Sequence, residues 1–167
     1  DTDQPVAVII RQLVQEQVDG FLFVNFPAAP LQELLLALNG QQYPAMAVGT
    51  HAGDRCDWAD IDREQSFETA TSYLLERGMR KVVMLETDVA PLYTAEKEKG
   101  YRRAMEVVGV RPRALVTTER KTARSVWQAA RSIVANRPDT EALLLTDNFF
   151  APTVQLALAE HDVRLMG

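Results

Sequence analysis

The chain has 167 residues, 47% hydrophobic and 25% charged, which excludes a disordered segment and suffices for one sizeable domain or two small lobes. Its net charge of −5 excludes nucleic-acid binding through bare electrostatics, because a DNA-contacting surface needs an excess of basic residues. No apolar run approaches the roughly 20 residues that span a bilayer, and the single cysteine, Cys56, excludes an internal disulfide and fits a reducing compartment.

Helical periodicity alternates with short apolar runs through the first part of the chain. In chain order, the predicted elements are a helix from Pro5, a strand at residues 21–24, a helix from Pro30 to Gly40 and a strand at residues 45–48. The apolar run at 21–24 is typical of a strand buried on both faces. Residues 49–60 have no period and are predicted to form the connection between two lobes.

The same alternation continues to the end of the chain. The elements predicted there are a helix capped by Asp62 and ended by Gly78, a strand at 82–85, a helix from Thr94 to Gly109, a strand at 114–116, a helix from Thr122, a strand at 142–145, a helix from Pro152 to Glu160 and an incomplete strand at 163–166. Gln65 occupies the capping-box position after Asp62. Because a proline is costly inside a helix, we expect a turn at 147–150 before Pro152.

Strands that alternate with helices of ten or more residues predict an α/β fold with parallel sheets and right-handed crossovers. The chain begins with Asp1 and has neither an initiator Met nor a charged-then-apolar leader. Its first predicted element is a helix and its last is an incomplete strand. We therefore expect the sequence to be an internal piece of a longer protein.

Apolar stripes identify the faces of the helices that we expect to be buried. They are Val6, Ile9, Ile10, Leu13 and Val14; Leu31, Leu34, Leu35 and Leu38; Phe67, Ala70, Thr71, Leu74 and Leu75; Tyr101, Ala104, Met105 and Val108; and Val126, Trp127, Ala130, Ile133 and Val134.

Open parallel sheets bind ligands at the carboxyl ends of their strands. The residues that follow the predicted strands are 25–27, 49–51, 86–88, 117–119 and 146–148. Most are small and polar, and either uncharged or acidic. Such groups suit a ligand rich in hydroxyls, which both donate and accept hydrogen bonds, and suit a phosphate poorly. Turns select the same residue types.

Several of these residues have two interpretations. Asp147 either caps the turn that follows its strand or binds a ligand. Lys97 lies in the first turn of its predicted helix, where a cation is unfavourable, and is either solvated or directed at ligand hydroxyls. Phe149 and Phe150 are either core residues or a surface on which a ligand stacks, and packing in the core is the favoured interpretation.

Motifs for catalysis and for cofactors are missing from the sequence. The positions of its eight glycines exclude both G-x-G-x-x-G and G-x-x-x-x-G-K-[ST], and only two histidines are present to serve as a base. The acids and His51 around Cys56 match no metal-ligand spacing and are interpreted as a solvated connector; Cys56 itself is expected to be partly buried and inert. We predict no cofactor, no metal and no catalytic residue.

Segments in a fixed order resemble the LacI/GalR family of transcriptional regulators. They are Asp19-Gly20 before a strand, Pro44-Ala-Met-Ala-Val48, Asp62 to Arg77-Gly78, Lys97-x-x-Gly100-Tyr101-x-x-Ala104, and Glu141 to Asp147 with the helix that follows.

The resemblance implies two Rossmann-like lobes of the type I periplasmic-binding-protein-like fold, which clamp a small effector, usually a sugar or nucleobase. It places residues 1–59 in the lobe nearer the DNA-binding head and residues 60–167 in the distal lobe. It also implies a cytoplasmic homodimer that binds operator DNA through a helix-turn-helix domain that this chain lacks. The predicted effector contacts are Asn25, Thr50, Asp88, Lys97, Thr146 and Asp147.

The chain departs from the family pattern at several positions. Ser66 replaces a Gly, Met79 a His, Lys97 the effector-contacting Arg and Thr146 an Asn. Lysine keeps the charge of arginine but loses its bidentate fork. Together these departures weigh against a standard monosaccharide and leave open a different, larger or lost effector. A secreted sugar-binding protein of a transporter is the alternative function, and an α/β enzyme is a third.

Overall fold

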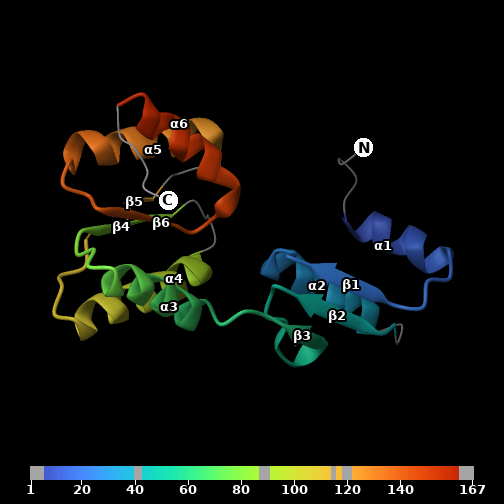
Figure 1. Ribbon diagram of the computed structural model, residues 1–167. Helices are drawn as coiled ribbons and strands as arrows, with labels where there is room; N and C mark the ends of the chain where they lie inside the picture. The colour runs from blue at the N-terminus through green and yellow to red at the C-terminus, as the bar shows by residue number, and fades with distance from the viewer. Residues whose placement is uncertain (1–5, 40–42, 87–90, 114–115, 118–121, 162–167) are drawn as a thin grey trace. The chain divides into compact units, whose positions relative to one another are not determined.

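The computed structural model describes residues 6–39, 43–86, 91–113, 116–117 and 122–161 (Figure 1). The chain divides into two compact units, Asp1–Ile61 and Asp62–Gly167. The assignment of residues 1–59 to a DNA-proximal lobe and of 60–167 to a distal lobe stays a prediction. The predicted strand at 163–166 and residues 114–115 lie outside the described residues.

The first unit is built on a parallel sheet. Its elements are α1 (Val6–Gln15), β1 (Phe21–Val24), α2 (Ala28–Asn39), β2 (Ala45–Val48), the 3₁₀ turn η1 (Gly53–Arg55) and β3 (Asp57–Ala59). The strands follow the order β1-β2-β3, with Phe23 opposite Ala47 and Ala47 opposite Trp58. Helix α2 begins before Pro30, because the first turn of a helix tolerates proline.

Strand β3 was not predicted: residues 57–59, within the segment that was predicted to connect the two lobes, form this strand. Three exposed residues are too few to display a period of two. The strand exists because its backbone pairs with β2, which no side-chain pattern reveals.

The core of the first unit lies on one face of its sheet. Ile10 of α1 packs with the four predicted leucines of α2 around Phe23 and Ala47. Leu22 and Val24, which alternate with Phe23 along β1, are 64% and 57% exposed. The expectation that this strand is buried on both faces is therefore wrong for the described residues, because both helices contact the Phe23 face. Ile9, at 40% exposure, also lies outside the core.

The second unit has a parallel sheet covered on both faces (Figure 1). Its elements are α3 (Arg63–Glu76), β4 (Val82–Glu86), α4 (Pro91–Val107), β5 (Val116–Thr117), α5 (Ala123–Asn136), β6 (Ala142–Leu145), the 3₁₀ turn η2 (Asn148–Phe150) and α6 (Ala151–Ala159). The strand order is β5-β4-β6. The predicted turn before Pro152 is confirmed, and Pro152 lies at the start of α6.

Alternate side chains of β4 face the two helix layers. Val82 and Met84 pack with residues of α3 and α4, whereas Val83 and Leu85 pack with α5 and α6. All five residues of β4 are buried, as a central strand in such a sheet requires. Most predicted inward faces are confirmed, but Val108 is 47% exposed because α4 ends at Val107.

Helices α3 and α4 pack closely because of a few specific residues. Asp62 caps α3, accepting a hydrogen bond from the Gln65 backbone N–H at 2.8 Å. Gly100 of α4 lies against the first turns of α3, where a Cβ atom would be 2.9 Å from both the Glu64 carbonyl carbon and the Glu68 nitrogen. The neighbouring Tyr101 hydroxyl donates to the Val82 carbonyl oxygen at 2.8 Å. These contacts hold α4 against both α3 and β4.

Within the described part of the chain, no helix has the length and apolar character that a membrane crossing demands.

Candidate functional site

Three polar side chains meet at the carboxyl edge of the second unit's sheet. Leu85 of β4 lies opposite Leu145 of β6, so the residues that end and follow these strands, Glu86 and Thr146, are neighbours. The Thr146 hydroxyl donates to Glu86 Oε1 at 2.8 Å, and the Lys97 ammonium nitrogen lies 3.5 Å from the same oxygen. We call Glu86, Lys97 and Thr146 the polar cluster.

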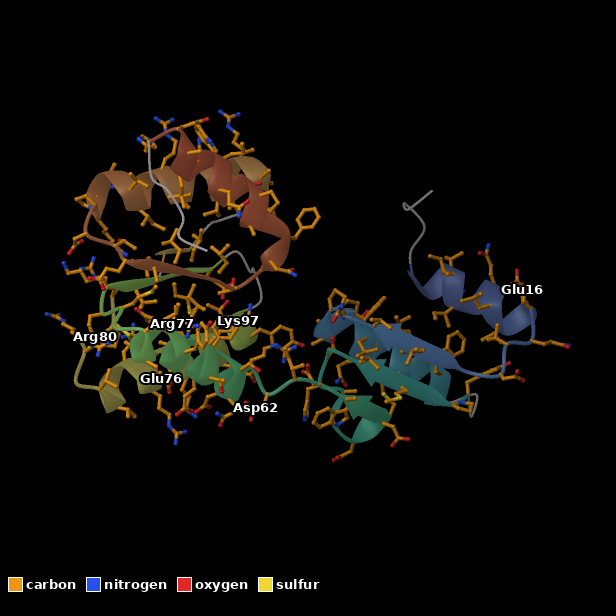
Figure 2. The ribbon with its side chains drawn as sticks, viewed as in Figure 1. Glu16, Asp62, Glu76, Arg77, Arg80 and Lys97 are labelled. Atoms are coloured by element: carbon orange, nitrogen blue, oxygen red, sulfur yellow. The ribbon has the colours of Figure 1, made fainter. Side chains whose placement is uncertain are left out.

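The polar cluster is largely removed from solvent. Glu86 has no exposed surface, and Lys97 is 8% exposed, between α4 and the sheet (Figure 2). Burying either charge alone is costly, and their pairing offsets that cost only while both remain. Glu86 and Lys97 therefore depend on each other.

Two expectations for Lys97 are wrong. The residue lies in the second turn of α4 instead of the first, because the helix begins at Pro91. It is also not a solvated lysine, because its ammonium group pairs with buried Glu86. The other interpretation, that Lys97 contacts an effector, stays a prediction.

Asp147 continues the same edge. Its Oδ1 accepts a hydrogen bond from the Phe149 backbone N–H at 2.9 Å and caps the turn η2. The capping interpretation is thereby confirmed. Contact of its carboxylate with a ligand stays a prediction.

The two phenylalanines after Asp147 separate into different environments. Phe150 is 4% exposed and belongs to the core with α5 and α6. Phe149 is 78% exposed, with its ring edge-to-face against Phe150 at 5.3 Å between centroids. The packing interpretation is correct for Phe150 alone. Phe149 presents an aromatic surface beside the capping aspartate.

Two predicted contacts lie at the carboxyl edge of the first unit's sheet. Asn25 follows β1 with a φ of +50°, and its backbone N–H donates to the Val48 carbonyl at 2.8 Å. Thr50 is 2% exposed and donates its hydroxyl proton to the Phe26 carbonyl at 2.7 Å. The Asn25 side chain packs against Gly49, leaving no space there for a Cβ atom. Both residues shape these loops, and their contact with an effector stays a prediction.

The sequence pointed to this edge of the sheet, but Glu86 was not among the predicted effector contacts. Asp88, which was named, lies outside the described residues. The available signal was an acid at the end of an apolar strand, followed eleven residues later by Lys97. Because a loop lies between the two residues, their spacing matches neither the repeat of a helix nor that of a strand. The sequence alone therefore does not indicate that their side chains meet.

The segment around Cys56 provides structural contacts. Cys56 is half-buried against the core of its unit, and burial raises the pKa of its thiol. The rings of His51 and Trp58 pack together with centroids 4.0 Å apart. In the portion of the chain that the structure describes, no three His, Cys, Asp or Glu side chains gather as metal ligands would.

Comparison with known proteins places these features in a family. The family model for periplasmic binding proteins and the sugar-binding domain of the LacI family matches residues 1–164. A curated relative, the HTH-type transcriptional regulator MalR of Streptococcus pneumoniae, is 18% identical over 165 residues, which are 98% of this chain and 50% of MalR. The chain thus spans about half the length of the curated relatives it matches.

Solved structures share the fold. A regulatory protein of the LacI family from Chloroflexus aggregans has a TM-score of 0.78 and 22% identity, with 98% of this chain and 59% of that chain covered. A periplasmic ribose ABC transporter structure from Conexibacter woesei has a TM-score of 0.79 and 17% identity, with 94% and 54% covered.

The predicted α/β fold of the periplasmic-binding-protein-like type is confirmed by these neighbours and by the parallel sheets. The named relatives are regulators and binding or transport proteins. Because the family model covers nearly the whole sequence, the chain belongs to the family of periplasmic binding proteins and LacI-type sugar-binding domains, as an effector-binding domain.

Proposed function

We propose that this chain is the ligand-sensing core of a LacI-type transcriptional regulator, and that its effector is a small polyhydroxylated molecule such as a sugar or sugar derivative. The proposed effector contacts are Asn25, Thr50, Asp88, Lys97, Thr146 and Asp147. The observation that carries the proposal is the polar cluster at the carboxyl edge of β4 and β6.

The chemistry of this edge suits hydroxyl groups. An ammonium group offers up to three donors, a carboxylate only acceptors, and a threonine hydroxyl one donor with acceptor capacity. The exposed ring of Phe149 adds an apolar surface next to Asp147. Small-molecule sites commonly combine a few fixed polar groups with aromatic side chains, and the apolar face of a sugar ring suits such a surface.

Regulation requires that ligand binding biases the equilibrium between two conformations. The effector need bind one conformation better by only about 1–3 kcal/mol to change operator affinity 5- to 150-fold. In this proposal the bias reaches DNA through a helix-turn-helix domain elsewhere in the protein, in a cytoplasmic homodimer. No residue performs covalent chemistry.

The alternative is a secreted sugar-binding protein that delivers its ligand to a transporter. The family model includes periplasmic binding proteins, and the Conexibacter woesei structure has a similar fold. Operator binding by the full-length protein separates the two functions, because only a regulator changes its affinity for DNA when ligand is added.

A thermal-shift screen of the full-length protein with glucose, ribose, maltose and trehalose tests the proposal. A ligand at about 100 times its Kd stabilises the folded state by about 2.7 kcal/mol. Asp147→Asn keeps an oxygen that can cap η2 and removes the charge, so it separates ligand contact from capping. If Lys97→Ala and Asp147→Asn both leave the ligand-induced shift unchanged, the proposed contacts are wrong.

A further inference from the structure

We propose that the effector site accepts an uncharged ligand and rejects a phosphorylated one, because Glu86 neutralises Lys97 inside the protein. This inference rests on the proposed function, since it concerns the ligand of the same site. It assigns Glu86 as a residue that determines specificity.

The geometry of the polar cluster is the first argument. The Lys97 ammonium nitrogen lies 3.5 Å from Glu86 Oε1, and the Glu86 side chain is completely buried. A phosphate that approached Lys97 would have to share this cation with a carboxylate that cannot turn toward solvent. Two anions on one partly buried cation repel each other, because the surrounding protein screens them less than water does.

The second argument is the balance of charge at this edge. Among the described residues that end or follow β4 and β6, Glu86 and Asp147 are acidic, and the cation Lys97 pairs with Glu86. The nearby cations Lys99, Arg102 and Arg103 of α4 pair instead with Glu64, Glu98 and Glu68 of α3 and α4. The described part of the edge therefore carries more negative than positive charge.

A neutral hydroxyl meets no such conflict. It can accept a hydrogen bond from the Lys97 ammonium group while Glu86 stays paired with that group, so a hydroxyl binds without a change in charge. Thr146 also holds the carboxylate in place, through its 2.8 Å hydrogen bond to Oε1. A hydroxyl-rich, uncharged molecule is the chemical class that this arrangement recognises.

The test uses Glu86→Gln in the full-length protein, with inorganic phosphate as the probe. Glutamine has nearly the same shape and keeps an acceptor for Thr146, but it removes the negative charge of Glu86 beside Lys97. Glu98→Gln is the matched control, because it removes one carboxylate from an exposed pair with Arg102 on the same helix. A control titration with chloride at the same ionic strength corrects for the general screening of charges by salt.

We expect phosphate to stabilise E86Q at concentrations at least tenfold lower than any that stabilise the wild type or E98Q. Adding Lys97→Gln to E86Q should abolish the increased stabilisation by phosphate. Equal responses of E86Q and E98Q would overturn the inference, because Lys97 would then not be the group that Glu86 neutralises. A specific rise in the wild-type Tm with phosphate would overturn it as well.

Matched sugar pairs test the wild type directly and do not depend on the folding of a variant. The pairs are glucose with glucose 6-phosphate, ribose with ribose 5-phosphate, and trehalose with trehalose 6-phosphate. Any pair that binds should bind at least tenfold more tightly in its neutral form. A preference for the phosphorylated member would overturn the inference and direct attention to Arg120 and Lys121, which follow β5 in the sequence.

Failure of the proposed function gives a different result. If no sugar changes the wild-type Tm while E86Q alone gains phosphate binding, the charge neutralisation stands and the sugar effector is wrong. If sugars bind and E86Q gains nothing, the proposed function stands and the role of Glu86 is wrong.

Discussion

Replacing Gly100 with alanine tests the closest helix contact in the second unit. In an ordinary helix interior, glycine to alanine stabilises by about 1 kcal/mol, because alanine loses less backbone entropy on folding. At Gly100 the new Cβ would lie 2.9 Å from two backbone atoms of α3, and closer still to the Glu64 carbonyl oxygen. A clash with backbone cannot be relieved by a rotamer change.

The magnitude follows from these opposing effects. Overpacking costs typically about 1–3 kcal/mol, and a backbone clash places this site at the upper end of that range. After the gain of about 1 kcal/mol from helix propensity, we expect a net destabilisation of about 2 kcal/mol. For a unit of about 100 residues, this lowers the Tm by roughly 8 °C.

Urea denaturation measures this effect in the second unit alone. The chain has two tryptophans, Trp58 and Trp127; in a Trp58→Phe background, the fluorescence of Trp127 reports on the second unit. Ala95→Gly, at an exposed position of α4, measures the helix-propensity effect separately and should cost about 0.5–1 kcal/mol. If Gly100→Ala were as stable as the wild type or more stable, α3 and α4 could not approach as described.

Three further predictions concern the same unit. Tyr101→Phe removes the donor to the buried Val82 carbonyl and should cost about 1–3 kcal/mol in urea denaturation, with exposed Tyr73→Phe as a neutral control. Asp62→Ala removes the cap of α3 and should cost about 1 kcal/mol, whereas Asp62→Asn should restore most of the loss. Hydrogen bonds from backbone N–H groups lower the pKa of Glu141 from its usual 4.5. The ionised carboxylate therefore stabilises the folded state above that value, and this stabilisation is lost as the pH falls below it. Measured as Tm against pH in the acid range, the Glu141→Gln variant should show a weaker dependence than the wild type.

The layered arrangement of the second unit was predictable from the sequence, because its apolar periods are strong. Leu75 and Met105 lie on apolar helix stripes, and Met84 lies in an apolar strand run. Both patterns are typical of buried positions, and all three residues are buried. The cap at Asp62 and the late start of α6 followed from the local chemistry of aspartate and proline. Such signals depend on residues close together in the sequence.

Features that depend on partners distant in sequence were not predictable. β3 exists because its backbone pairs with β2, and the exposure of Leu22 depends on which face of the sheet the helices cover. Lys97 looked like an exposed cation because its neighbours Glu96 and Glu98 are charged. Only the position of α4 against β4 reveals that it meets Glu86.

The same face of α4 positions both the packing contact and the proposed site. Lys97 precedes Gly100 by three residues and Tyr101 by four, which places all three on neighbouring turns of one helix face. The close approach at Gly100 and the hydrogen bond of Tyr101 to β4 fix the height of α4 over the sheet. That height determines whether the Lys97 ammonium reaches Glu86. A larger residue at Gly100 should therefore weaken ligand binding as well as stability, whereas Glu86→Gln should change ligand charge preference while this packing stays intact. We therefore expect the two substitutions to separate the stability of this packing from the charge preference of the proposed site.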